Sequence, residues 1–277
     1  MKRKIIDKIM QFLIYTSGGV VCFILLFILG YVIFKGISSL NLDFFIRLPK
    51  PVGEPGGGMV NAIVGSFILV LLASLWSVPI GVFSGVYLAE SSNSAKPSKF
   101  SSVLRFLLDV LSGVPSIVIG IFTYSLIVSP MKKFSAVSGG VALGIIMLPT
   151  ITRTTEEMIK MVPRNIKEAS LALGISYWKT VFFVILNTAK PGILTGILLA
   201  VARIFGETAP LLFTAFGNRF WHRSLFDPIS ALPLQIFAYA ISPYDDWHRQ
   251  AWTGALVLIL IVYLIILISR KILLKYK

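Results

Sequence analysis

Apolar side chains gather in six long runs along the chain, and polar stretches separate them. A helix needs about 20 predominantly apolar residues to cross a hydrocarbon core of about 30 Å. The first run is too long for the apolar part of a signal peptide, and no small-residue cleavage site follows it, so it counts as a span. The pattern predicts membrane-spanning helices at residues 12–34, 60–88, 103–128, 139–159, 192–216 and 251–268.

The composition points to the same class of protein. Hydrophobic residues make up 56% of the 277 residues and charged residues 14%, whereas soluble domains carry about 25% charged residues. The predicted fold class is therefore all-α integral membrane, with six transmembrane helices. The single cysteine, Cys22, excludes an intrachain disulfide and provides no metal cluster.

The net charge of +14 is interpreted as a topology signal. The basic residues lie between the apolar runs and form no patch with interleaved aromatic residues, so we expect no nucleic-acid partner. Cytoplasmic loops of membrane proteins carry an excess of Lys and Arg. If the N-terminus is cytoplasmic, 17 of the 26 Lys and Arg residues lie inside and eight outside, among them Lys132 and Lys133. This distribution predicts that both termini are cytoplasmic.

A polar segment at residues 163–191 separates the fourth run from the fifth, on the predicted cytoplasmic side. Pro163 suits the first turn of a helix, and Gly174 suits its end, because glycine adopts the left-handed conformation there. Ser176 is a good N-cap for a second helix. The segment therefore predicts a helix over 163–173, a sharp turn and a second helix.

Residues of the first of these helices divide between two faces. Glu168 and Ala172 share one face because they are four positions apart. Another part of the helix has a shallow surface on which a second protein can dock. Its residues are Ala169, Ser170 and Leu173. The alternative interpretation is an ordinary cytoplasmic hairpin.

The fifth run contains Arg203, Glu207 and Thr208. Counting about 1.5 Å per residue from position 192 places Arg203 roughly 16 Å into the bilayer. A charged side chain at that depth costs about 2.5 kcal/mol or more, so we expect the pair to face a polar interior. Either Arg203 and Glu207 form a structural ion pair, or Arg203 attracts an anion in transit while Glu207 limits how tightly it is held.

A second pair four residues apart, Arg105 and Asp109, lies near the start of the third run. We expect it to be an ion pair at a helix end. Prolines and paired glycines also interrupt the runs, and we expect kinks at the prolines and close helix packing at the glycines. The positions are Pro79, Pro115, Pro149 and Pro210, and Gly81, Gly85, Gly113 and Gly120.

The sequence lacks the signatures of a motor or an enzyme. No glycine is followed by lysine, so no P-loop of the form G-x-x-x-x-G-K-[ST] is present. The apolar runs contain no H-E-x-x-H, no nucleophile with a base and no paired aspartates. We therefore expect the chain to be no enzyme and to bind no metal or other cofactor itself.

The series E-A-S-x-x-x-G formed by Glu168, Ala169, Ser170 and Gly174 resembles the EAA loop of ABC-importer permeases, here residues 168–187. The I-x-L-P that ends this loop in the family is not matched. Four further strings resemble PstA-type permease subunits of phosphate importers. They are EPGGGMVNAIVGSFILVLLASL at 54–75, LSGVPSIVIG at 111–120, RIFGETAPLLFTA at 203–215 and ALPLQIFAYA at 231–240.

The resemblance implies a type I ABC importer permease in the cytoplasmic (inner) membrane, with a cytoplasmic coupling helix. It implies a heterodimer with a PstC-type permease subunit, two copies of a PstB-type ATPase and a PstS-type phosphate-binding protein. ATP and Mg would be bound by the ATPase, which would dock on Glu168, Ala169, Ser170 and Gly174. The substrate pathway would contain Arg203, Glu207 and Thr208.

Two alternatives stay open at this point. One is a permease for another oxyanion, such as phosphonate, molybdate or sulfate, and the other is a membrane assembly subunit that transports nothing. The expected organisation is an N-terminal segment with the first span and its external loop (1–57), the permease domain (58–270) and a cytoplasmic tail (271–277). Within the external loop 217–250, residues 229–241 are apolar but too short to span, so we expect a helix at the outer interface.

Overall fold

The computed structural model describes residues 2–51, 54, 56–92 and 98–275. Within these residues the chain is helical, and the only β-type contact is an isolated bridge between Phe216 and Ile229. This confirms the predicted all-α class. The helices are α1 (Lys2–Gly36), η1 (Ile37–Ser39), α2 (Leu42–Ile46), α3 (Val60–Ser92), α4 (Lys99–Gly113), α5 (Ser116–Thr123), η2 (Tyr124–Val128), α6 (Ser129–Met131), α7 (Ala136–Lys160), α8 (Arg164–Ala172), α9 (Tyr177–Lys179), η3 (Thr180–Ile185), α10 (Leu186–Phe205), α11 (Ala209–Thr214), α12 (Leu232–Ala240) and α13 (Asp245–Lys275).

Five helical segments of the described chain are long and apolar enough to cross a membrane, or six if a bent pair counts as one more. The bent pair joins Lys99–Gly113 to Ser116–Met131 at an angle of 106°. The span predicted over 103–128 is therefore present as two helices separated by a break, at the proline where a kink was expected. The chain bends because Val114 is extended ahead of Pro115, which has no N–H to continue the helix.

The fifth predicted span is displaced along the chain. Its helical segment runs from Tyr177 to Phe205, and not from residue 192 to 216. Pro191 lies inside α10, where the loss of one backbone hydrogen bond does not end the helix. Gly206 ends it, and a short break then separates α10 from α11.

Only two of the four prolines lie where kinks were expected. Pro79 and Pro149 are inside α3 and α7. Pro115 and Pro210 stand instead at the beginnings of α5 and α11. The first N–H groups of a helix have no intrahelical acceptor, so a proline there costs no hydrogen bond. At Pro115 the chain therefore breaks between two helices with a bend of 106°, in place of a kink inside one helix.

Helices α3 and α7 cross at the centre of the molecule, and small residues allow their close approach. A Cβ at Gly85 would lie 2.5 Å from the Thr155 Cβ, and one at Gly81 would lie 2.8 Å from an Ile151 methyl. This confirms the predicted close helix packing at these two glycines. Gly120 is packed in the same way, because a Cβ there would lie 2.7 Å from the Pro210 Cα. A Cβ at Gly113 would have no neighbouring atom within 4 Å, so the close helix packing expected at this glycine is not found in this chain.

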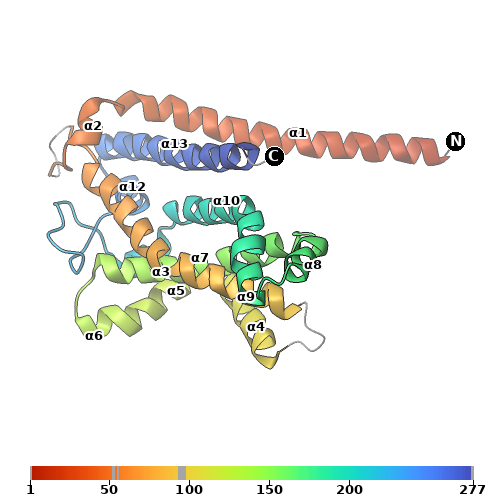
Figure 1. Cartoon of the computed structure of the whole chain (residues 1–277). Coiled ribbons are helices and arrows are strands. Elements are labelled where there is room, and N and C mark those ends of the chain that lie inside the picture. The colour runs from red at the N-terminus through yellow and green to blue at the C-terminus, as the bar shows by residue number, and fades with distance from the viewer. Residues whose placement is uncertain (1, 52–53, 55, 93–97, 276–277) are drawn as a thin grey trace.

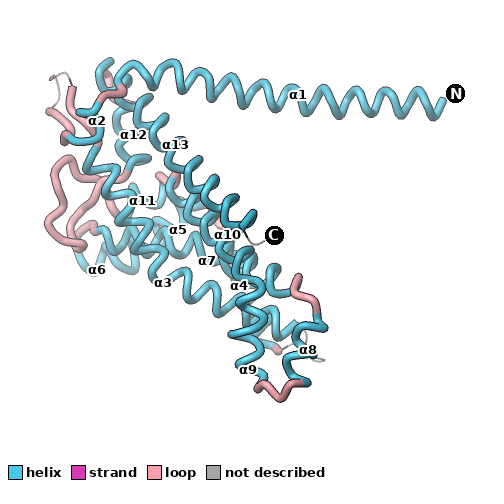
Figure 2. The backbone as a smooth tube through the Cα atoms, turned by 45° about the horizontal axis from the view of Figure 1, so that its top comes forward, coloured by secondary structure: helices cyan, strands magenta, loops and turns pink. Residues whose placement is uncertain are grey.

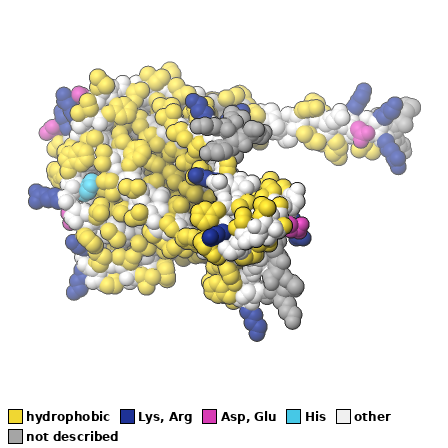
Figure 3. Space-filling view, viewed as in Figure 1, with side chains coloured by type: hydrophobic (Ala, Val, Ile, Leu, Met, Phe, Trp, Pro, Cys, Tyr) yellow, Lys and Arg dark blue, Asp and Glu magenta, His cyan; other side chains and the backbone are white. Residues whose placement is uncertain are grey.

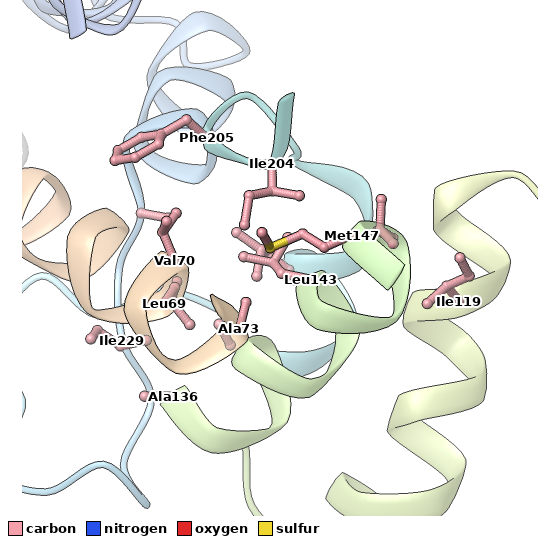
Figure 4. Close-up of a cluster of buried hydrophobic side chains, with 14 of the residues drawn as sticks. Leu69, Val70, Ala73, Ile119, Ala136, Leu143, Met147, Ile204, Phe205 and Ile229 are labelled. Carbon is pink, nitrogen blue, oxygen red and sulfur yellow. The ribbon is translucent and has the colours of Figure 1, made fainter. Parts of the chain in front are cut away.

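The main hydrophobic core surrounds this crossing (Figure 4). Leu69 and Ala73 of α3 meet Leu143 and Met147 of α7 there, and α10 covers them with Ile204. The core fixes α10 against the centre of the bundle. It thereby also fixes the position of the charged residues at the end of α10.

Helices α1 and α13 contact one another near Gly36 at the end of α1. From there α1 diverges from α13 and extends beyond the bundle toward the N-terminus (Figures 1 and 2). The Thr253 hydroxyl of α13 donates to the Gly36 carbonyl at 2.8 Å. Space-filling colours show a broad hydrophobic surface, with Lys and Arg mainly at its edges (Figure 3). Such a surface is expected where lipid or other subunits surround a protein.

Candidate functional site

The polar hairpin has the predicted local structure. Helix α8 lies between Pro163 at its N-cap and Leu173 at its C-cap. Gly174 has a φ of +78°, the left-handed value that favours glycine, and its N–H donates to the Leu171 carbonyl at 3.0 Å. Ser176 holds the N-cap position of α9, although its side chain makes no capping hydrogen bond.

The residues expected to dock an ATPase divide between the surface and the interior of this hairpin. Glu168 and Ala169 are exposed, and Leu173 is 81% exposed. Ser170 is buried, and its hydroxyl lies 2.9 Å from that of Thr180. Ser170 therefore joins the two helices of the hairpin and is not part of the exposed face.

Sequence reasoning missed a cluster that ties the hairpin to α3. The Lys167 ammonium contacts the Glu90 carboxylate and donates to the Tyr177 hydroxyl at 3.2 Å, and Tyr177 also donates to Glu90. Both charged side chains are largely buried. Burial alone would lower the pKa of Lys167, but the contacts with Glu90 and Tyr177 outweigh it and raise that pKa above 10.5. The cluster thus joins α3, α8 and α9 at one end of the bundle.

The expected ion pair between Arg105 and Asp109 does not form within α4. Arg105 instead contacts Glu156 of α7 at 2.6 Å, and Lys160 contacts the same carboxylate oxygen at 2.5 Å. Asp109 pairs with Arg153, also of α7. The prediction of a helix-end pair is wrong because α7 lies alongside α4 and supplies better-placed partners than a neighbour one turn away.

Arg203 lies in the last turn of α10, and Glu207 and Thr208 follow in the break before α11. The guanidinium Nε is 3.8 Å from a Glu207 carboxylate oxygen, which is too long for a hydrogen bond. The Arg203 side chain is 59% exposed and that of Glu207 17%. The Thr208 carbonyl accepts the N–H groups of Leu211 and Leu212 and so begins α11.

The two sides of α10 differ in their surroundings. Ala200, Ile204 and Phe205 are buried in the main core. Leu199 and Arg203, four residues apart, lie on the exposed side. Arg203 is therefore directed away from the core of its own chain. The helical segment begins at Tyr177, so Arg203 stands near the Phe205 end of the segment.

The short apolar helix expected at 229–241 is present as α12. Leu232, Leu234 and Tyr239 are buried in it, because α12 lies against α3 and α13. It is thus part of the folded bundle, and residues of α12 and Leu212 of α11 line one cavity.

Residues 77–276 match the family described as binding-protein-dependent transport system inner membrane component. The chain is 44% identical to the phosphate transport system permease protein PstA of Haemophilus influenzae over 97% of this chain and 94% of that protein. It is 48% identical to the protein of that name from Xylella fastidiosa over 88% of this chain and 84% of that protein.

The fold is similar to that of a solved structure, the inward facing MetNI methionine ABC transporter, with a TM-score of 0.62. The alignment covers 78% of this chain and 93% of that one at 17% identity, so it shows the fold alone. Together with the relatives it confirms the predicted ABC importer permease architecture, a multi-pass membrane protein that is a permease and not an enzyme. The chain therefore belongs to the binding-protein-dependent transport system inner membrane component family, and within it to the PstA-type permeases.

Proposed function

We propose that this chain is the permease subunit of an ATP-driven importer that carries inorganic phosphate across the cytoplasmic membrane. It would act as a heterodimer with a PstC-type permease, with two PstB-type ATPase copies inside and a PstS-type phosphate-binding protein outside. The names of the relatives support phosphate as the substrate. ATP and Mg belong to the ATPase in this proposal, and both termini of the chain lie in the cytoplasm.

The observation that carries the proposal is the position of Arg203. A guanidinium facing acyl chains costs about 2.5 kcal/mol or more, yet Arg203 is 59% exposed on α10. A second permease subunit that covers this side of α10 would separate the Arg203 side chain from lipid. Arg203 would then lie in a polar interface between the two subunits. Because Glu207 stands 3.8 Å away, the guanidinium N–H groups remain free to bind an oxyanion.

The hairpin and Arg203 lie at opposite ends of one helical segment. From Tyr177 to Phe205 the chain rises about 40 Å at 1.5 Å per residue, which exceeds the thickness of a hydrocarbon core. With the hairpin inside, Arg203 belongs to the outer half of the membrane. The exposed Leu173 and Ala169 of the hairpin are then presented to the ATPase, while Arg203 meets anions arriving from outside.

Replacement of Arg203 tests the proposal. A hydrogen bond to a charged group contributes about 1.5 to 3 kcal/mol, so Arg203→Gln should lower phosphate uptake by about tenfold or more in cells that carry only this transporter. Arg270→Gln, an exposed arginine near the end of α13, serves as control and should keep uptake unchanged. Assembly is checked by co-purification of the partner subunits.

Two outcomes would contradict the proposal. If the Arg203→Gln transporter assembles normally and takes up phosphate at the unmodified rate, Arg203 is not part of the transport pathway. The chain would then be better described as an assembly subunit. Uptake of sulfate, molybdate or phosphonate in place of phosphate, in the unmodified transporter, would assign another oxyanion.

A further inference from the structure

A cavity of about 270 Å³ opens beside α11 and α12, in the part of the fold that follows Arg203. Its polar lining comes from the loop after α11 and from α12, and its walls are apolar. The lining residues used in the argument are Asn218, Arg219, Ser230, Gln235, Phe237 and Tyr239. Under the topology proposed above, this cavity lies on the outer side of the membrane.

Three buried polar side chains form one side of the cavity. Ser230, Gln235 and Tyr239 are 3%, 6% and 2% exposed. Ser230 donates its hydroxyl hydrogen bond to the Gln235 side-chain oxygen at 2.9 Å, and Gln235 hydrogen-bonds the Tyr239 hydroxyl. Polar groups buried among apolar helices cost free energy unless they are paired, and these three satisfy that requirement by bonding one another. They thus form a fixed polar wall on one side of the cavity.

These side chains supply hydrogen-bond donors at neutral pH. Burial raises the pKa of the Tyr239 phenol above 10, against the opposing effects of Gln235 and the Arg219 charge. The hydroxyl therefore keeps its proton. The Gln235 amide carries two N–H donors, and Tyr239 occupies at most one of them.

Arg219 stands at the rim of the cavity with its charge uncompensated by a carboxylate among the described residues. Its guanidinium lies 4.9 Å from the centre of the Trp247 ring. Trp247 in turn stacks on Tyr239 with ring centroids 4.5 Å apart. A stacked guanidinium uses its face for the aromatic ring, so the N–H groups along its edge remain free to bind an anion.

Resting on the proposed function, we infer that this cavity is an outer oxyanion site that holds inorganic phosphate before it reaches Arg203. Arg219 provides the charge, and Gln235 and Tyr239 provide neutral donors. Only the last two residues of α10, the break at 206–208, α11 and four loop residues separate the two arginines along the chain, and α11 itself rises about 9 Å. A pair of weak sites in series suits passage better than one tight site.

Protection of an introduced thiol tests the site independently of transport. The assembled transporter is placed in nanodiscs with Cys22→Ser, which removes the single native cysteine, and with Phe237→Cys in the cavity. Inorganic phosphate should slow modification of that thiol by a cationic methanethiosulfonate reagent, whereas chloride at equal ionic strength should not. Adding Arg219→Gln should weaken the protection by about tenfold or more in phosphate concentration.

Controls separate this inference from the proposed function. Arg223→Gln removes an exposed arginine of the same loop that does not line the cavity, and Phe226→Cys places a thiol outside it. The first should keep the protection, and the second should show none. Arg203→Gln should lower uptake by about tenfold or more but leave the protection intact, so failure of the transport pathway and failure of the outer site give different results.

Three results would overturn the inference. The first is no protection by phosphate, and the second is protection that is equal with and without Arg219. The third is protection by phosphate-free binding protein alone, because Arg219 would then be a protein-docking contact. An unchanged melting temperature and unchanged co-purification of the partner subunits show that Arg219→Gln has not disturbed the fold.

Discussion

Charged side chains have different partners at the two ends of the bundle. At the proposed cytoplasmic end, Glu156 contacts both Arg105 and Lys160, and Glu90 contacts Lys167. At the proposed outer end the exposed pairs Arg47–Asp43 and Arg249–Asp246 do form. Arg203, however, stands too far from Glu207 for a hydrogen bond. Arg219 has an aromatic ring as its neighbour in place of a carboxylate.

The difference separates two uses of charge. Cations paired with buried carboxylates join helices, because either partner alone would be left with an unsatisfied charge. Cations without such partners keep their donors available to a passing anion. This difference agrees with the proposal that the proposed cytoplasmic end transmits movement from the hairpin into α3 and α7, and that the proposed outer end binds and releases a ligand.

The largest expected effect on stability comes from removing a shared carboxylate at the inner end. Glu156→Gln leaves Arg105 and Lys160 without their counter-ion, and should lower the free energy of unfolding by about 2 kcal/mol, since solvent partly screens the two cations. The measurement is thermal unfolding of the purified permease complex in detergent. Glu157→Gln, which changes the neighbouring exposed glutamate, is the control and should unfold like the unmodified protein. Identical melting temperatures for both variants would show that the pairing is incidental.

A smaller effect is expected where the hairpin meets α3. Lys167→Met breaks its contacts with Glu90 and Tyr177, and loss of about 1 kcal/mol of coupling corresponds to about a fivefold change in an equilibrium. The transporter should hydrolyse ATP but move about fivefold less phosphate per ATP, because movement of the hairpin no longer reaches α3.

The matched control for this prediction is Lys179→Met, whose lysine lies over the Trp178 ring and has no salt bridge among the described residues. Exchange of the partners, Glu90→Lys with Lys167→Glu, should restore part of the coupling. If Lys167→Met and Lys179→Met transport the same amount of phosphate per ATP, the contacts of Lys167 do not couple movement of the hairpin to α3.

The hairpin could be predicted from the sequence because local chemistry determines it. Pro163, Gly174 and Ser176 each favour a particular backbone position, and the structure places all three there. Arg203 and Glu207 could also be found, since charged residues stand out in an apolar run. The start of their helix could not, because the segment is already helical from Tyr177, well before the predicted start at residue 192.

Contacts between distant segments were beyond the reach of the sequence. Glu90 and Lys167 are 77 positions apart, and no periodicity links them. The ion pairs between α4 and α7 could not be predicted for the same reason. Arg105 and Asp109 have the right spacing to pair with each other within α4. Only the three-dimensional arrangement shows that Glu156 lies closer to Arg105, and Arg153 closer to Asp109. The polar cavity around Gln235 likewise needs α12 to be placed beside the loop after α11.

The smallest expected effect is the pH dependence of the inner cluster. Burial alone would lower the pKa of Lys167, but its contacts with Glu90 and Tyr177 raise it above 10.5. A lysine whose pKa is raised by folding stabilises the folded state fully below the pKa of the unfolded chain, and this contribution is lost as pH rises through the folded pKa. The difference in melting temperature between the unmodified protein and Lys167→Met should therefore stay constant from about pH 6 to pH 9 and shrink only above about pH 10.5. A difference that already vanishes near pH 8 would mean that another group, titrating there, holds the hairpin to α3.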